Sequence, residues 1–316
     1  MTPSVFIDGE AGTTGLGIRD RLRALPDIEL KSLPFDRRRD PSARREMMAQ
    51  VNAVILCLPD DAARESVALA ESLGNAAPKL LDASTAHRVH PDWTYGFPEM
   101  LEGQADRIAA SCKVANPGCY PTGAIGLIRP LVDAGLIPPD YPITINAVSG
   151  YSGGGRSMIE SHENDGGPAF ELYALQLEHK HLPETQTYCG LTRRPIFVPS
   201  VGHFRQGMLV SVPLHLDTLR GKPTGGHLHD VLQDRYRGCE YVRVVEPQPN
   251  GKLEPEALND TNILELSVHT NDRRGQAVLV ARLDNLGKGA SGAAAQNLRL
   301  MLGLPADAAH LEKVHA

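Results

Sequence analysis

The chain has 316 residues, 41% of them hydrophobic, and a formal net charge of -6 at pH 7. A chain of this size can bury a sizeable core, and two domains are the natural expectation. Its mild acidity argues against nucleic acid as the main partner. No apolar run reaches the roughly 18 residues of a membrane span, and no basic flank precedes an apolar core at the start. We therefore expect no membrane partner and a cytoplasmic location.

The first segment reads as a strand, a glycine-rich turn and a helix. Residues 5–7 are apolar, and apolar residues recur at helical spacing over 18–25. Between these runs, glycines at intervals of three let the backbone approach a pyrophosphate at the helix N-terminus. The spacing departs from the usual G-x-G-x-x-G, and such turns are common in α/β proteins. The turn residues expected to contact the cofactor are Gly9, Gly12, Thr13, Thr14 and Gly15.

Three further strands are expected at residues 28–33, 53–58 and 79–82, with a helix starting at Asp60. Strands that alternate with helices indicate a parallel, doubly wound sheet of the Rossmann-like type. The carboxyl edge of such a sheet binds the nucleotide, so Ser84, after the fourth strand, is expected on the cofactor side.

The end of the second expected strand is where the adenosine ribose of a dinucleotide lies. Ser32 stands there, followed by Arg37, Arg38 and Arg39. These cations favour the 2′-phosphate of NADP, and we expect Ser32, Arg37 and Arg38 to contact it. Asp36 offers the alternative of a free ribose hydroxyl and hence NAD, and a solvated basic loop is a third interpretation.

Five cysteines without CxxC or zinc spacing indicate reduced thiols, and no metal site is expected. Cys119 follows Pro117-Gly118 and precedes a dense apolar run that ends near Gly135, so it occupies the first turn of a helix. A helix N-terminus favours the thiolate, which is the nucleophilic form of cysteine. By contrast, Cys57 and Cys112 lie in apolar, strand-like runs and are expected to be packed core residues.

A second domain is expected beyond Cys119, because strands follow one another there with few helices between them. The pattern predicts an open, largely antiparallel sheet in an α+β domain, and a helix over 289–302. A broad sheet with one face left over commonly associates, so a homodimer or homotetramer is expected. The expected strands are 143–148, 196–198, 208–213, 241–245, 263–268 and 276–283.

Several motifs together resemble the N-acetyl-gamma-glutamyl-phosphate reductases of arginine biosynthesis, in the wider semialdehyde dehydrogenase group. The resemblance covers nearly the whole chain. It departs from the longer members at Glu10 and Thr14, where they typically carry a small residue and Tyr, and is closer to a short subgroup. The segments that carry it are 9–15, 116–122, 149–156, 179–184 and 285–292.

The resemblance implies an NADPH-dependent reductase that converts an acyl phosphate into an aldehyde through a Cys119 thioester. It also implies a C-terminal domain like that of glyceraldehyde-3-phosphate dehydrogenase. The chemistry leaves the acyl tail open, so an aspartate-semialdehyde dehydrogenase or another acyl-phosphate reductase is an alternative. Two further alternatives are a Rossmann reductase without covalent catalysis and a regulator that senses NADP without turnover.

Proton transfer in such a reaction calls for a histidine near the thiol. Among twelve histidines, His181 and His179 rank equally, because they lie in the family-like segment beside Glu184, which could fix their orientation. His203 ranks third, since the related aspartate-semialdehyde dehydrogenases take the base from a comparable later segment.

The remaining site residues are assigned by their motifs. The substrate is expected to contact Asn116, Arg88, Arg156, Ser149 and Gly150. In the family the C-terminal helix packs back on the nucleotide domain, which would place Asn285, Gly287 and Lys288 near the nicotinamide. The expected domains are an NADP-binding domain over 1–117, a catalytic and dimerisation domain over 118–284, and the returning helix over 285–316.

Overall fold

The computed structural model describes residues 2–306, which form two compact units. The first unit runs to Pro117 and takes up the chain again at Ala290. The second runs from Gly118 to Gly289. The last ten residues of the expected C-terminal segment, 307–316, lie outside the described residues. Within the described part of the chain, no helix is long and apolar enough to cross a membrane.

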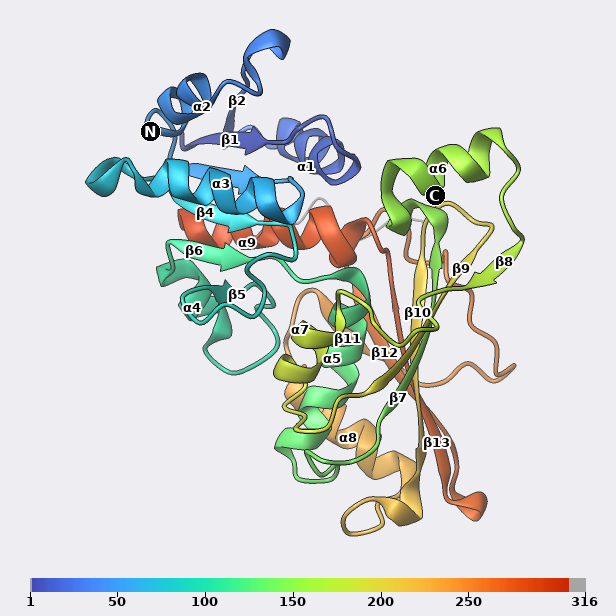
Figure 1. The fold of residues 1–316 in the computed structure, drawn as a ribbon. Coiled ribbons are helices and arrows are strands. Elements are labelled where there is room, and N and C mark those ends of the chain that lie inside the picture. The colour runs from blue at the N-terminus through green and yellow to red at the C-terminus, as the bar shows by residue number, and fades with distance from the viewer. Residues whose placement is uncertain (1, 307–316) are drawn as a thin grey trace. The chain divides into compact units, whose positions relative to one another are not determined.

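A parallel six-stranded sheet forms the centre of the first unit (Figure 1). Its strand order is β2-β1-β3-β4-β6-β5, so the winding direction reverses between β1 and β3. The elements are β1 (Ser4–Asp8), α1 (Thr13–Arg23), β2 (Glu29–Lys31), η1 (Phe35–Arg37), α2 (Pro41–Met48), β3 (Ala53–Leu56), α3 (Asp60–Glu71), η2 (Gly74–Ala76), β4 (Lys79–Asp82), β5 (Thr94–Tyr95), α4 (Gln104–Ala110), β6 (Lys113–Ala115) and α9 (Gly292–Leu302).

Both faces of this sheet are covered, which is why every residue of β1 and β3 is buried. Ile18 and Leu22 of α1 join Ala294 and Leu298 of α9 in the core on one face. On the other face, residues of α2 and α3 pack on the sheet. The predicted doubly wound α/β architecture is confirmed.

The second unit is built on a seven-stranded mixed sheet of order β11-β12-β13-β10-β7-β9-β8. Four of its neighbouring pairs are antiparallel and two are parallel, in agreement with the predicted largely antiparallel sheet. The elements are α5 (Cys119–Asp133), β7 (Thr144–Gly150), η3 (Tyr151–Gly154), α6 (Gly155–Asn164), β8 (Phe170–Leu172), α7 (Leu182–Tyr188), β9 (Ile196–Gly202), β10 (Met208–His215), η4 (Leu216–Thr218), α8 (Gly225–Arg235), β11 (Val242–Val244), β12 (Leu264–Asn271), η5 (Asp272–Arg274) and β13 (Gln276–Leu283); the π-turn η6 (Gly287–Ser291) leads on to α9.

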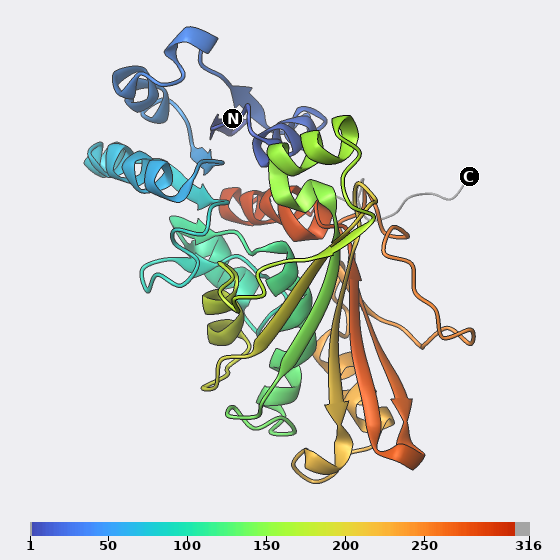
Figure 2. The same cartoon turned by 45° about the vertical axis from the view of Figure 1, so that its right-hand side comes forward.

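Helix α5 packs closely on one face of this sheet (Figure 2). A Cβ at Gly123 would lie 2.9 Å from Val210 and 3.2 Å from Ala281, so glycine lets the helix approach the strands. Side chains of the opposite face, including Leu209 and Val278, line a shallow hollow of about 600 Å³. The sheet therefore presents a largely apolar face that none of the described helices of its own unit covers.

The two cysteines expected in the core behave differently from that expectation. Cys112 is exposed, because β6 begins one residue later, at Lys113. Its assignment as a packed residue was wrong. Cys57 lies one residue beyond the end of β3 and is half-buried, and burial together with Asp82 and Asp8 raises the pKa of its thiol. This thiol is therefore unreactive near neutral pH.

Candidate active site

Cys119 is the first residue of α5, at the helix start that the sequence predicted. Gly118 before it is the N-cap residue; it has an extended backbone and no side chain of its own to cap the helix. The N–H groups of such a first turn carry the positive end of the helix dipole. This environment favours a thiolate at Cys119, whose residue is half-buried.

Glu184 of α7 holds the same helix start. Its side chain is 1% exposed, and a carboxylate oxygen accepts a hydrogen bond from the Gly118 N–H at 3.1 Å. The sequence motif instead predicts that Glu184 orients the neighbouring histidines. The contact with Gly118 joins residues 66 positions apart and could not be predicted from the motif.

A cavity of about 140 Å³ lies at Cys119 within the second unit. His203 is not among the described residues that line it, and neither is Arg156. Arg156 is instead 83% exposed and pairs with Glu160 of its own helix at 2.8 Å. The lining brings together five of the predicted residues, namely Cys119, His179, His181, Ser149 and Gly150.

The two histidines of the cavity have different electrostatic states. The Nδ1 atom of His179 accepts a hydrogen bond from the backbone N–H of His181 at 3.1 Å. Burial, with a contribution from Lys180, lowers the pKa of His179 to about 4. His179 is therefore neutral near pH 7, with its proton on Nε2, and cannot serve as an imidazolium beside the thiol.

His181 and His203 occupy very different surroundings. His181 is 7% exposed and forms part of the cavity lining, at the residue before α7. His203 is exposed, and its Nδ1 lies 3.0 Å from Nδ1 of His162 on α6. Of these two histidines, His181 lies at the cavity and His203 is not among the described residues that line it.

Two tyrosines that the sequence analysis did not single out complete the cavity. The Tyr120 hydroxyl donates to the Ser200 carbonyl at 3.1 Å and accepts from the Tyr173 hydroxyl at 3.1 Å. Burial, reinforced by the nearby Cys119, raises the pKa of Tyr173 to about 12. Tyr173 therefore stays neutral near pH 7. No motif marks it, because it follows β8 in an irregular segment.

The predicted glycine turn of the first unit is closely packed. Gly9 has φ +91°, and a Cβ there would lie 2.4 Å from the Cys57 carbonyl oxygen. A Cβ at Gly15 would lie 2.5 Å from the Gly9 carbonyl oxygen, and the Gly12 N–H donates to that same oxygen at 3.1 Å. Thr14 is half-buried in the first turn of α1, whereas the side chain of Thr13 lies outside the described part.

This turn follows β1, beside the point where the strand order reverses. Open α/β sheets bind dinucleotides in the crevice at such a point, with the pyrophosphate at the helix N-terminus. The turn and the start of α1 thus fit a dinucleotide.

The predicted ribose-end residues are engaged with Glu10, which is 5% exposed. The Ser32 hydroxyl donates to Glu10 Oε2 at 2.9 Å, and Arg38 Nη2 lies 2.5 Å from Glu10 Oε1. Arg37 points elsewhere and pairs with Asp40 at 3.3 Å. The structure therefore brings Ser32 and Arg38 together and leaves Arg37 apart.

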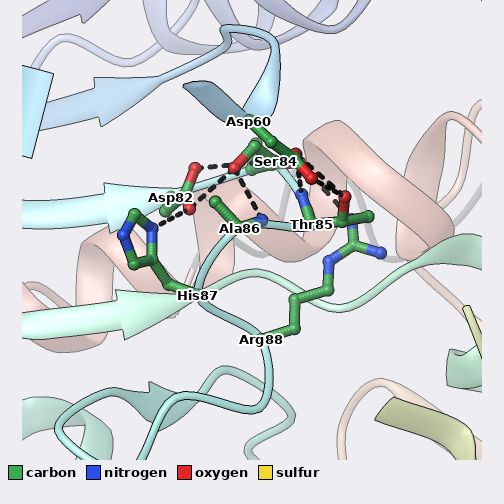
Figure 3. Close-up of polar contacts among 8 residues, drawn as sticks. Asp60, Asp82, Ser84, Thr85, Ala86, His87 and Arg88 are labelled. Carbon is green, nitrogen blue, oxygen red and sulfur yellow. Dashed lines mark hydrogen bonds and ion pairs between the residues drawn. The ribbon is translucent and has the colours of Figure 1, made fainter. Parts of the chain in front are cut away.

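Ser84 and Arg88 belong to a hydrogen-bonded turn after β4 (Figure 3). Ser84 Oγ donates to Asp82 at 2.8 Å and accepts from the Ala86 N–H at 3.1 Å. His87 Nδ1 lies 2.6 Å from the same carboxylate. The turn is thus rigid, and it holds the buried Arg88 with one guanidinium nitrogen 3.4 Å from the Ala83 carbonyl.

Asn116 and Asn285 are buried and bonded within their own units. Asn116 donates to the Ala290 carbonyl at 3.1 Å and accepts from Asn297 at 3.0 Å. Asn285 accepts from the Gly207 N–H at 2.8 Å and donates to Ser152 at 2.9 Å. Both amides therefore fix local backbone.

Gly287 and Lys288 lie in the π-turn before α9. A Cβ at Gly287 would lie 2.0 Å from the Thr261 carbonyl oxygen, so this position requires glycine. Lys288 is 1% exposed, with Nζ 5.2 Å from the centre of the Tyr241 ring. Its ammonium is therefore held against an aromatic face.

Comparison with solved structures shows the fold. An aspartate-semialdehyde dehydrogenase from Francisella tularensis superposes with a TM-score of 0.72 at 12% identity, covering 95% of this chain and 100% of that one. An aspartate-semialdehyde dehydrogenase with NADP from Candida albicans gives 0.63 at 13% identity, covering 96% and 99%.

Comparison of sequences shows the family. The model of the semialdehyde dehydrogenase dimerisation domain matches residues 119–285. An N-acetyl-gamma-glutamyl-phosphate reductase from a Chelativorans species is 54% identical over 311 residues, covering 96% of this chain and 99% of that protein. N-acetyl-gamma-glutamyl-phosphate reductase 2 of Pseudomonas putida is 52% identical over 308 residues, covering 96% and 97%. Since this likeness runs through both units and includes the Cys119 segment, the chain belongs to the N-acetyl-gamma-glutamyl-phosphate reductase family.

Proposed function

We propose that the protein reduces N-acetyl-gamma-glutamyl phosphate to N-acetyl-glutamate semialdehyde, with NADPH as the reductant and release of phosphate, as a step of arginine biosynthesis. The observation that carries the proposal is Cys119 at the N-terminus of α5, in a cavity with His179 and His181. The sequence identity of 52–54% with N-acetyl-gamma-glutamyl-phosphate reductases supports the assignment of the N-acetyl-glutamyl group as the acyl part of the substrate.

Covalent catalysis begins at the Cys119 sulfur. The thiolate attacks the acyl carbon, the bond from that carbon to the phosphate oxygen breaks with its electron pair, and a thioester remains on Cys119. The dipole of α5 stabilises the thiolate, and Glu184 keeps Gly118 and the helix start in place. The bound NADPH supplies the hydride that brings the acyl carbon to the aldehyde level.

His181 is the proposed proton donor and acceptor. It donates a proton to the oxygen of the reduced acyl group and takes it back as the carbon–sulfur bond breaks, which frees the aldehyde and the Cys119 thiolate. The neutral His179 accepts the His181 N–H and so fixes the backbone of its partner. This arrangement divides the roles of two histidines that the sequence alone ranks equally.

The first unit is proposed to hold NADP through its glycine turn, through Ser32 directly after β2, and through Arg38 directly after η1. Arg88 and Ser149 remain proposed substrate contacts, because one is buried after β4 and the other lines the cavity. A reduced catalytic thiol suits the cytoplasm, which we propose as the location.

We also propose that the protein is a homo-oligomer joined through the open face of the seven-stranded sheet. Exposed Phe170, Leu172 and Val278 and the shallow apolar hollow lie in this sheet. Light scattering of the wild type and of Val278→Asp would test it, since a buried aspartate should shift the protein to a smaller species. An unchanged mass would contradict this interface.

One assay separates the reaction from its alternatives. In the reverse direction, with NADP⁺ and phosphate, the protein should oxidise N-acetyl-glutamate semialdehyde and leave aspartate semialdehyde almost untouched. Preference for the free amino compound would contradict the proposed substrate. Cofactor binding without turnover of either aldehyde would point instead to a sensor of NADP.

A further inference from the structure

Glu10 is one of the two residues, with Thr14, at which the glycine turn departs from the pattern typical of the longer family members. Its side chain is buried, yet each carboxylate oxygen faces a donor from the segment that follows β2. Ser32 donates to one oxygen, and Arg38 pairs with the other. A carboxylate thus binds the same two side chains that we assign to the 2′-phosphate of NADP.

The two donors are well placed for a ligand. Ser32 is exposed, and Arg38 is one-third exposed. Arg38 is also held by its Nε, which donates to the Leu33 carbonyl at 3.3 Å, and by the Phe35 ring, whose centre is 5.5 Å from its guanidinium carbon. Both side chains are therefore accessible to solvent on one side and bound to the buried Glu10 carboxylate on the other.

The hydrogen bonds set up a competition. A serine hydroxyl has one hydrogen, and that of Ser32 is donated to Glu10, so it must leave Glu10 before it can donate to a phosphate. Arg38 keeps further N–H groups, but its charge is already neutralised by the Glu10 carboxylate. A 2′-phosphate at these donors would also stand close to a buried anion and be repelled by it.

We propose that Glu10 is an internal competitor of the 2′-phosphate and thereby sets the preference of this protein between NADP and NAD. It holds Ser32 and Arg38 in place before the cofactor binds, and it lowers the affinity of these two side chains for the 2′-phosphate. NAD lacks the 2′-phosphate, so its affinity does not depend on this competition. The proposal rests on the assignment of NADP to the first unit.

The test is a binding titration, which does not depend on turnover. Calorimetry would compare NADP⁺, NAD⁺, adenosine 2′,5′-bisphosphate and AMP against the wild type and Glu10→Gln. The amide keeps the size of the side chain and removes the charge. We expect NADP⁺ and the bisphosphate to bind about tenfold more tightly to Glu10→Gln, with NAD⁺ and AMP changed less than twofold. Unchanged or weaker NADP⁺ binding would overturn the proposal and make Glu10 a support for Arg38.

Two controls make the result specific. Glu65→Gln removes an exposed carboxylate from α3 and should leave all four affinities unchanged. If Glu10→Gln folds poorly in a thermal melt, Glu10→Ala, which restores a small residue, is expected to show the same tightening, and a loss there would equally overturn the proposal. A wild type that binds NAD⁺ as well as NADP⁺ but reduces the acyl phosphate would contradict the cofactor assignment and leave the Cys119 chemistry standing.

Discussion

The buried carboxylate of Glu184 accepts the backbone N–H of Gly118, the residue directly before Cys119. This bond ties the start of α5 to α7, so the position of the thiol depends on a residue that is not among the described residues lining the Cys119 cavity. Charge-assisted bonds of this kind contribute about 1.5 to 3 kcal/mol.

Glu184→Gln should therefore lower kcat by about three- to tenfold while KM changes little, because the neutral amide oxygen accepts the Gly118 N–H more weakly than the carboxylate does. Steady-state kinetics over a range of substrate concentrations would measure both constants. Glu178→Gln is the matched control, since Glu178 pairs with Arg194 on the surface at 2.7 Å and should have little effect. A selective rise in KM would show instead that Glu184 binds substrate.

Cys119→Ser should bind NADP⁺ almost normally and lose reduction by several orders of magnitude, because serine has no comparable anion near pH 7. Mass spectrometry of protein mixed with acyl phosphate, without NADPH, should find an adduct on Cys119. The exposed Cys112 can react adventitiously, so the experiment belongs in a Cys112→Ser background. An adduct at any other cysteine would refute the thioester. Because Cys112 is exposed, Cys112→Ser itself should leave the thermal midpoint unchanged.

His181→Gln should slow turnover by about 10² to 10⁴-fold, since proton transfer at the reduced acyl group is lost. Acyl-enzyme or its reduced adduct should then accumulate on Cys119 and be visible by mass spectrometry. His203→Gln is the control and should retain most of the activity, because His203 pairs with His162. The reverse ranking would return the acid–base role to His203.

The depressed pKa of His179 predicts a pH dependence of stability. Its folded-state pKa, about 4, lies below the unfolded value of about 6.5, so between these values the unfolded chain binds more protons. The contribution of His179 is complete above pH 6.5 and is lost as the pH falls towards 4. His179→Asn keeps an acceptor for the His181 N–H and should flatten the fall in thermal midpoint over this range. If the thermal midpoint falls equally with pH in the wild type and in His179→Asn, a group other than His179 is responsible for the fall.

Gly289→Ala should damage the site by crowding it. A Cβ at Gly289 would lie 2.8 Å from Cys119 Cβ and 3.1 Å from the Asp284 carbonyl oxygen. We expect a loss of stability of about 1 to 3 kcal/mol, measured by urea unfolding, and a fall in kcat. Gly226→Ala in α8 is the control. Apart from its chain neighbours and its own helix backbone, the described residue within 4 Å of its Cβ is Thr224, at 3.8 Å, so this change should be neutral or stabilising.

The sequence determined the elements whose signals are local. The helix that begins at Cys119 was predicted because Pro117-Gly118 stops a strand-like run and an apolar helical run follows. The glycine turn after β1 and the alternation of strands and helices predicted the parallel sheet. Where the sequence pattern was weak, the observed strand boundaries differ from the predicted ones. The strand β2 covers only Glu29–Lys31 of the predicted 28–33, and Cys112 lies just before β6.

The tertiary structure alone decided which side chains meet. Glu184 and Gly118, Glu10 and Arg38, and Tyr120 and Tyr173 are separated by many residues, and no spacing rule relates them. The same holds for the two histidines, which are equivalent in the motif but differ in burial and in hydrogen bonding. Periodicity reports which face of an element is buried, whereas partners, protonation states and competing anions depend on the packing of distant segments.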